Sequence, residues 1–390
     1  MAENDKNQVP AAGRKKRDLL PLLVFFLLLC GGLLGCLSIY NARIAGEAPL
    51  YFALRQLGWL GAGSLLFVFS SLVPFRFYRK SAPFLALLSA LLLVAVLLFG
   101  SRVNGMRGWL VLPGNLSFQP SELAKVFFLL ALTVFATKRK KIGTGGFFLM
   151  LCFTFFFLFL LMREPDFGSA VVFFGAFLIV AASREGSMKA FLLALAALFV
   201  CALAFIFRHD YAFMRILAFF DPDGAGVSSW HMRQFQYTLA HGGLTGSEAG
   251  TALWARNYLP LPHTDSLFAS LVELTGFAGS TLVILIFAGL GIAFTLISWK
   301  TKGECGRLYV FCAGMLCFFQ ALLHISVNCV LLPATGVTLP MLSYGGSSLL
   351  SVMLSFGIAL SAAAEQDPED PAEEDEEPSG PPAGEVSPHP

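Results

Sequence analysis

The chain has 390 residues, of which 56% are hydrophobic and only 13% are charged, and its formal net charge is +2. Soluble globular proteins carry roughly 25% charged residues, so this shortage of charge excludes an ordinary water-soluble enzyme. The eight cysteines form no C-x₂-C pair and most lie in apolar runs. We therefore interpret them as small hydrophobic residues rather than as disulfides or metal ligands.

Apolar segments long enough to cross a bilayer recur along the chain, each with about 20 mostly apolar residues. We therefore predict an all-α polytopic membrane protein with about ten transmembrane helices. The first segment follows a basic stretch but has no clear cleavage site, so it is interpreted as a membrane helix rather than a signal peptide. The last but two is long and is expected to tilt or to begin with a non-spanning turn. The predicted spans are residues 19–39, 52–73, 82–99, 120–137, 146–162, 168–183, 190–207, 267–298, 308–330 and 342–364.

The basic residues predict that both termini are cytoplasmic. Of the 27 Lys and Arg, 17 lie in segments that this topology places inside, and nine, all arginine, lie outside. This is the positive-inside distribution. The predicted domains are a basic N-terminal segment, 1–18, a membrane domain, 19–364, and an acidic, Pro-rich, disordered tail, 365–390. A large outer loop, 208–266, separates predicted helices seven and eight, and loops of this length are often functional.

Charged residues stand at the start of the fourth predicted span, in the stretch FQPSELAK at 118–125. Pro120 suits the first position of a helix. Glu122 and Lys125 are three residues apart and therefore share one helix face. Charges near the membrane surface face a cavity or each other. A structural ion pair and a site for a charged ligand are both open at this point.

Two aspartates precede predicted helices: Asp166 in REPDFGS and Asp265 in LPLPHTD. Each is placed either to cap the next helix or to present a carboxylate at the mouth of a cavity. Glu273 follows Asp265 by eight residues, about 12 Å along a helix. Paired glycosidase carboxylates stand about 5 to 9.5 Å apart, so these two do not form such a pair. Asp265 is then a lone base or a metal ligand, and a lone base suffices for an acidic leaving group such as a diphosphate.

The segment before the last predicted span contains Pro333 and Pro340 within eight residues and continues as Ser343-Tyr344-Gly345-Gly346. Two prolines so close together argue against a regular helix. Non-helical backbone at membrane depth is tolerated only where it lines protein or water. Re-entrant structure beside a cavity and close helix packing are the two interpretations.

The order and spacing of these stretches resemble the SEDS family (shape, elongation, division and sporulation), which includes FtsW and RodA. The resemblance covers about residues 19–364. The matching pieces are Arg55-Gln56, NG-x-R-x-W at 104–109, FQPSELAK at 118–125, EPDFGSA at 164–170, F-x-DP at 219–222, GGLTG at 242–246, LP-x-x-HTD at 259–265 with Glu273, and LPATGVTLPMLSYGGSSLL at 332–350.

The resemblance implies a bundle in the bacterial cytoplasmic membrane that polymerises lipid II into glycan strands at its outer face. The reaction inverts the linkage and releases undecaprenyl diphosphate. By resemblance Asp265 is the catalytic base. A divalent cation, Mg²⁺ or Mn²⁺, would neutralise the diphosphate, but the sequence shows no dedicated metal site. The expected substrate-binding residues are Arg107, Glu122, Lys125, Asp166, Glu273, Ser343 and Tyr344.

The resemblance also implies partners: a class B penicillin-binding protein with transpeptidase activity, and other division or elongation proteins. No nucleic acid is expected. The NGMRGW and SYGGSSLL stretches are closer to the division type, FtsW, than to the elongation type, RodA. Rival functions are a flippase or transporter for lipid-linked precursors and a non-catalytic division scaffold.

The sequence departs from the family pattern in several places, including a short and irregular loop around 221–236. Ser-Leu-Phe follows Asp265, Leu-Thr-Gly follows Glu273, and His324 stands where the family commonly has Asn. We interpret His324 either as a satisfied polar residue within the bundle or as a titrating contact near the cavity.

Overall fold

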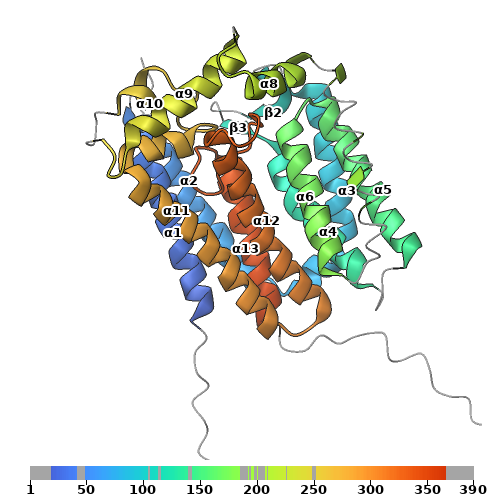
Figure 1. Ribbon diagram of the computed structural model, residues 1–390. Helices are drawn as coiled ribbons and strands as arrows, with labels where there is room; N and C mark the ends of the chain where they lie inside the picture. The colour runs from blue at the N-terminus through green and yellow to red at the C-terminus, as the bar shows by residue number, and fades with distance from the viewer. Residues whose placement is uncertain are drawn as a thin grey trace, which may run out of the picture.

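The structure is a computed structural model, and it shows a bundle of long helices with shorter elements across one end (Figure 1). The parts of the chain that it describes are residues 19–41, 49–103, 106–112, 116–138, 143–184, 210–224, 226–247 and 252–365, with a few positions between 192 and 208.

In the described parts of the chain, nine helices coincide with predicted spans. Eight of them are long and apolar enough to cross a membrane, and α6, with 17 residues, is shorter. The expected helical, multi-pass membrane architecture is confirmed, whereas predicted span 190–207 lies largely outside the described residues. The nine helices are α1 (Leu20–Asn41), α2 (Pro49–Leu72), α3 (Phe75–Phe99), α4 (Pro120–Thr137), α5 (Thr144–Arg163), α6 (Phe167–Ser183), α11 (Leu267–Lys300), α12 (Glu304–Asn328) and α13 (Gly346–Ala364).

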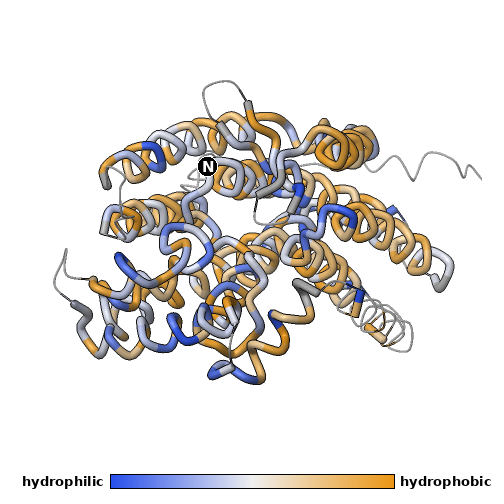
Figure 2. Tube along the Cα trace, turned by 90° about the horizontal axis from the view of Figure 1, so that it is seen from above, coloured by the Kyte–Doolittle hydropathy of each residue, from blue (hydrophilic) through white to orange (hydrophobic). Residues whose placement is uncertain are grey.

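Helices α4, α12 and α13 lie at the centre of the bundle, and α13 packs against α2, α12 and α4. Hydrophobic residues predominate along the spanning helices (Figure 2). Outer helices leave large apolar side chains exposed, among them Leu22 on α1, Phe69 on α2 and Phe159 on α5. Such exposure is costly in water but suits a surface that contacts lipid, so the burial pattern agrees with a membrane bundle.

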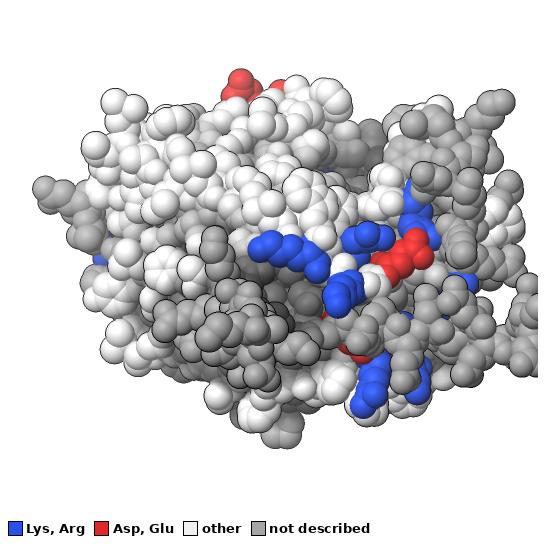
Figure 3. All heavy atoms as spheres, turned by 90° about the horizontal axis from the view of Figure 1, so that it is seen from below, with Lys and Arg blue, Asp and Glu red and all other residues white. Residues whose placement is uncertain are grey.

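The start of α1 and the end of α13 lie at the same end of the bundle (Figure 1). Lys and Arg side chains outnumber acidic ones on the described part of the face seen from that end (Figure 3). This distribution agrees with the positive-inside rule. The assignment of this end to the cytoplasm stays a prediction.

The opposite end, called the outer end here, carries the elements between the spans. A small antiparallel sheet of order β1-β2-β3 follows α3. The sequence analysis, which predicted helices only, did not include this sheet. Its strands are β1 (Ser101–Val103), β2 (Met106–Leu112) and β3 (Leu116–Phe118). The described residues of the large outer loop form three further helices, α8 (Asp210–Phe220), α9 (Val227–Gly242) and α10 (Leu253–Asn257).

Helix α11 is interrupted at Gly276, whose φ of 64° lies in the left-handed region that favours glycine. The interruption frees the N–H of Phe277, which donates to the Gly243 carbonyl at 3.0 Å. Backbone packs directly on backbone here, because a Cβ on Gly246 would lie 2.2 Å from the Leu274 carbonyl oxygen. The GGLTG stretch therefore packs against the interruption and accepts a hydrogen bond from the backbone that it frees. The sequence predicted that this long helix tilts or begins with a non-spanning turn.

Candidate functional site

Glu122 and Lys125 form a buried ion pair on α4, with Lys125 Nζ 2.5 Å from Glu122 Oε2. The pair is tied to two neighbouring helices. Lys125 Nζ donates to Gln320 Oε1 of α12 at 2.9 Å, and Ser351 Oγ of α13 donates to Glu122 Oε2 at 3.3 Å. A buried pair is tolerated only when such hydrogen bonds satisfy its remaining groups. The sequence predicted the shared helix face, but Gln320 and Ser351 were not predicted.

Asp166 caps α6, as one of the two sequence interpretations proposed. Its Oδ1 accepts from the Ser169 N–H at 2.9 Å, and its Oδ2 accepts from Ser169 Oγ at 2.6 Å. Oδ2 also accepts from Ser121 Oγ and from Gln119 Nε2, both at 3.3 Å. The carboxylate thus holds the start of α6 against the start of α4.

A small polar cavity of about 20 Å³ adjoins the Glu122–Lys125 pair and Ser169, the residue that Asp166 caps. It is large enough for about one water molecule and too small for a sugar. Its polar lining comes from α4, α6, α12 and the segment before α13. The polar residues and the segment that line it are Gln119, Ser121, Glu122, Lys125, Ser169, Gln320 and 336–338.

Asp265 lies immediately before α11, partly buried, and its carboxylate faces the turn at Gly336. A Cβ on Gly336 would lie 3.8 Å from Asp265 Oδ2. Gly336 also lines the small polar cavity, so the Asp265 carboxylate lies beside one of its walls. Asp265 is not the cap of α11: the N-cap is Ser266, and its Oγ donates to the Pro260 carbonyl. The capping interpretation of Asp265 is therefore wrong.

The charge of Asp265 is set by its surroundings at the outer end. Burial raises the pKa of Asp265, Arg215 of α8 lowers it, and Asp166 raises it further. Arg215 Nη1 also donates to the Ala334 carbonyl at 2.9 Å, so it spans from α8 to the segment before α13. The sequence showed only that the outer basic residues are all arginine and did not single out Arg215.

Arg107 lies on β2, beside the turn between α5 and α6. Its backbone N–H donates to the Glu164 carbonyl at 3.3 Å, and its Nη1 donates to the Leu97 carbonyl at 3.1 Å. The fully buried Glu164 has no hydrogen-bond partner for either carboxylate oxygen among the described residues. Burial raises the pKa of Glu164 to about 9, with a further contribution from Asp166.

Further polar atoms at the outer end are buried without a partner in the described part of the chain. They are Arg107 Nε, His263 Nδ1 and Thr335 Oγ1. Buried polar atoms without partners are rare in native structures and usually contact water or a ligand. They lie on β2, on the segment before α11 and on the segment before α13.

Glu273 points toward the outer loop. Its carboxylate accepts from the backbone N–H of Trp254 at 3.0 Å and of Ala255 at 2.7 Å, and contacts His241 Nδ1 at 3.0 Å. It therefore caps α10 and fastens it to α11. These contacts explain Glu273 without a substrate, and its substrate-binding role stays a prediction.

Ser343 and Tyr344 join the segment before α13 to the segment before α11. Ser343 Oγ donates to the Thr264 carbonyl at 2.8 Å, and the Tyr344 N–H donates to the His263 carbonyl at 2.8 Å. Gln56 of α2 holds the same segment, with Nε2 3.1 Å from the Ser343 carbonyl. The non-helical segment predicted from Pro333 and Pro340 is thus tied on both sides and lines the small polar cavity.

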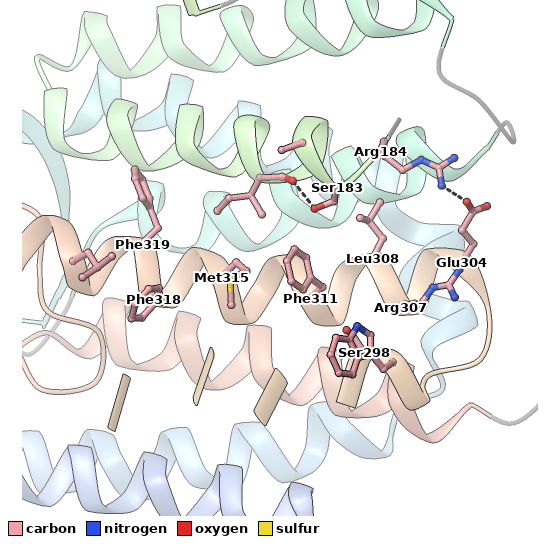
Figure 4. A pocket seen from close by; sticks show the side chains of 14 residues that line it. Ser183, Arg184, Ser298, Glu304, Arg307, Leu308, Phe311, Met315, Phe318 and Phe319 are labelled. Atoms are coloured by element: carbon pink, nitrogen blue, oxygen red, sulfur yellow. Dashed lines mark hydrogen bonds and ion pairs between the residues drawn. The ribbon is translucent and has the colours of Figure 1, made fainter. Parts of the chain in front are cut away.

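A larger cavity of about 670 Å³ opens between α6, α11 and α12 toward the other end of the bundle (Figure 4). Its lining is mostly apolar, and an ion pair between Arg184 and Glu304 stands at one end. None of the predicted site residues lines it. The candidate site is therefore the outer one.

Residues 18–367 match the family of cell cycle proteins that comprises FtsW, RodA and SpoVE. The chain belongs to this family. This FtsW/RodA/SpoVE-family chain is 33% identical over 357 residues to a probable peptidoglycan glycosyltransferase FtsW of Nitrosomonas europaea, covering 87% of this chain and 91% of that one. It is 30% identical over 339 residues to the peptidoglycan glycosyltransferase MrdB of Escherichia coli, covering 83% and 90%.

Solved structures show the same family fold. A chain of a peptidoglycan synthase complex that coordinates polymerization and crosslinking matches with a TM-score of 0.74 and 27% identity, covering 88% of this chain and 97% of that chain. The rod shape determining protein RodA of Thermus thermophilus matches with a TM-score of 0.66 and 26% identity, covering 89% and 96%. This chain is similar both to an FtsW and to a RodA. The preference for the division type over the elongation type therefore stays a prediction.

Proposed function

We propose that this chain is a peptidoglycan glycosyltransferase that polymerises lipid II at the outer face of the cytoplasmic membrane, with Asp265 as the general base. The observation that supports this most directly is the placement of Asp265. Its carboxylate is not used to cap α11, and it faces Gly336 at the edge of the small polar cavity. Curated relatives named peptidoglycan glycosyltransferases support the reaction class.

In the proposed reaction, the hydroxyl oxygen of the acceptor attacks the anomeric carbon of the donor sugar, and Asp265 takes the proton of that hydroxyl. The bond from that carbon to the diphosphate oxygen breaks, and undecaprenyl diphosphate leaves. A positioned base contributes about 10²- to 10⁴-fold to the rate. Because the diphosphate is already a good leaving group, a single carboxylate is sufficient.

The cationic groups at the outer end suit the negative charge of the diphosphate. Arg215 lowers the pKa of Asp265, and the buried Nε of Arg107 has no hydrogen-bond partner among the residues that the structure describes. Arginine binds phosphate oxygens in a bidentate manner, and donors held in place before reaction stabilise developing charge most effectively. We assign these two arginines to the diphosphate, and Lys125 with Glu122 to the polar floor beneath the sugar.

Within the described residues, no group of three or more His, Cys, Asp or Glu side chains could hold a metal ion. The residues therefore do not fit a resident metal, and no step is assigned to one. That Mg²⁺ or Mn²⁺ neutralises the diphosphate stays a prediction.

The small polar cavity is too small for a sugar, so substrate must bind at its outer mouth or open it. A partner that favours an open state would raise activity by shifting the population. The likeness to a chain of a synthase complex that coordinates polymerization and crosslinking supports a transpeptidase, a class B penicillin-binding protein, in this role.

The test is glycan-strand synthesis from purified lipid II by the full chain and by Asp265→Asn, each with and without a cognate transpeptidase. We expect polymer from the wild type and a loss of at least about 10²-fold in the variant. Equal polymer from both proteins would show that Asp265 is not the base. If neither makes polymer with the partner, lipid II transport between vesicle leaflets tests the flippase alternative.

A further inference from the structure

The first turn of α11 is capped by side chains from another helix. The first N–H groups of a helix have no partner within it and usually receive one from the N-cap side chain. Here the Ser266 hydroxyl is directed to the Pro260 carbonyl instead. Asn328 Oδ1 of α12 accepts from the Ala269 N–H at 3.0 Å, and His324 Nε2 accepts from the Phe268 N–H at 3.4 Å.

Asn328 also holds the backbone of Asp265. Its Nδ2 donates to the Asp265 carbonyl at 3.0 Å and to the His324 carbonyl at 3.0 Å. One side-chain amide thus contacts the backbone on both sides of the α11 start. Asn328 is fully buried, so water cannot replace these bonds if the amide is removed.

His324 connects the same helix start to the cavity segment. Its Nδ1 lies 2.7 Å from the Val337 carbonyl. Because Nε2 accepts from a backbone N–H, the ring is neutral and Nδ1 carries the proton. The 3.4 Å contact to Phe268 is long for a hydrogen bond, so Asn328 provides the stronger cap. His324 fixes Val337, the neighbour of Gly336, which faces Asp265.

We propose that Asn328 and His324 are positioning residues for Asp265. They cap α11 from α12, fix the Asp265 backbone and the turn at Val337, and so leave the Asp265 carboxylate free to take a proton. An aspartate just before a helix ordinarily directs its carboxylate to the first N–H groups. The proposal rests on the proposed role of Asp265 as base.

Removal of the cap has a specific consequence. In Asn328→Leu the Ala269 N–H loses its acceptor, and the Asp265 carboxylate, one residue before the N-cap Ser266, is the nearest carboxylate on the N-terminal side of the helix. A carboxylate that accepts backbone N–H bonds at a helix start is held in its ionised form, which lowers its pKa. It is also turned away from the substrate. We therefore expect kcat to fall about 10- to 100-fold, as for a misplaced catalytic group, with the KM for lipid II within about threefold.

The experiment compares Asn328→Leu and His324→Phe with Tyr309→Phe in the full chain with its cognate transpeptidase. Tyr309 is a matched control, because it is a fully buried polar residue of the same helix whose hydroxyl contacts Ser355 Oγ at 3.4 Å, away from Asp265. All three variants lose buried hydrogen bonds and are expected to lose thermal stability. Only the first two should lose kcat, and Asn328→Leu should also move the acid limb of the pH–rate profile to lower pH.

Combination with Asp265→Asn separates the two proposals. If the capping residues act through the base, Asp265→Asn/Asn328→Leu is no slower than Asp265→Asn alone, because residues that act as a unit are not additive. Losses that multiply, or an Asn328→Leu enzyme with wild-type kcat and pH profile, overturn the positioning role. An Asp265→Asn enzyme as active as the wild type overturns the proposed role of Asp265 as the base. If Asn328→Leu does not fold, His324→Phe in the wild-type chain and in Asp265→Asn gives the same comparison.

Discussion

Asp265 and Gly336 lie side by side at the outer end of the bundle, although they are 71 positions apart in the sequence. Gly336 has a φ of 75°, and a Cβ built on it would lie 3.8 Å from Asp265 Oδ2. The turn therefore favours glycine for its backbone, and a side chain at this position would contact the Asp265 carboxylate.

Gly336→Ala should lower glycan synthesis about tenfold or more, because a methyl group beside the carboxylate displaces the acceptor. The left-handed backbone adds a cost of about 1–2 kcal/mol. Polymer formation and thermal unfolding in detergent measure the two effects. Gly58→Ala is the control, since a Cβ there meets nothing within 4 Å. Wild-type polymerisation by Gly336→Ala would argue against this face of Asp265 as the reactive one.

Lys125→Met should destabilise the bundle by about 3–5 kcal/mol, because it leaves the buried Glu122 carboxylate without its cation. The double variant Glu122→Gln/Lys125→Met should recover much of the loss, since no charge then remains buried. Thermal unfolding of the purified chain checks both. If the double variant recovers its stability but makes no polymer, the pair contributes to catalysis as well as to folding. If polymer synthesis recovers together with stability, the pair contributes to folding alone.

Arg215→Gln should move the acid limb of the pH dependence of kcat/KM to higher pH. Burial raises the pKa of Asp265 and Arg215 lowers it, so removal of the guanidinium raises the pKa further. The base is then protonated, and inactive, up to a higher pH. Arg233→Gln is the control, because Arg233 of α9 donates to the Asp223 carbonyl on the exposed loop. If the acid limb of the pH dependence does not move, Arg215 does not influence the pKa of the base.

Gly246→Ala should be far more destabilising than Gly243→Ala. Both glycines have positive φ, 82° and 54°, so the backbone cost is similar. A Cβ on Gly246 would lie 2.2 Å from the Leu274 carbonyl oxygen, whereas one on Gly243 meets nothing within 4 Å. The two variants therefore isolate the close approach at the break in α11. Comparable melting temperatures would show that this contact is dispensable.

Glu164→Gln should gain stability relative to the wild type as the pH rises from 5 to 8. The pKa of Glu164 is raised to about 9 in the folded chain, while the unfolded carboxyl ionises near 4.5. Between these values the unfolded state binds fewer protons, so wild-type stability decreases with pH. Glutamine does not titrate and lacks this dependence. Melting temperatures of both proteins at pH 5 and pH 8 test the sign, and parallel curves would mean that Glu164 is ionised when folded.

The sequence alone determined the membrane architecture, because a span is encoded locally by about 20 apolar residues. Nine of the ten predicted spans are helices in the described chain. Asp166 as a helix cap and the shared face of Glu122 and Lys125 were also local properties, set by helix geometry and by the residues at a helix start. The resemblance to a family then marked Asp265 without showing what surrounds it.

Only the tertiary structure decided what caps α11 and which groups surround Asp265. Asn328, His324, Arg215 and Gly336 come from α12, α8 and the segment before α13, and no local pattern relates them to residue 265. The small sheet that carries Arg107 was likewise absent from the predicted elements. Sequence spacing reports neighbours along one helix or strand, whereas hydrogen bonds between helices depend on how the whole bundle packs.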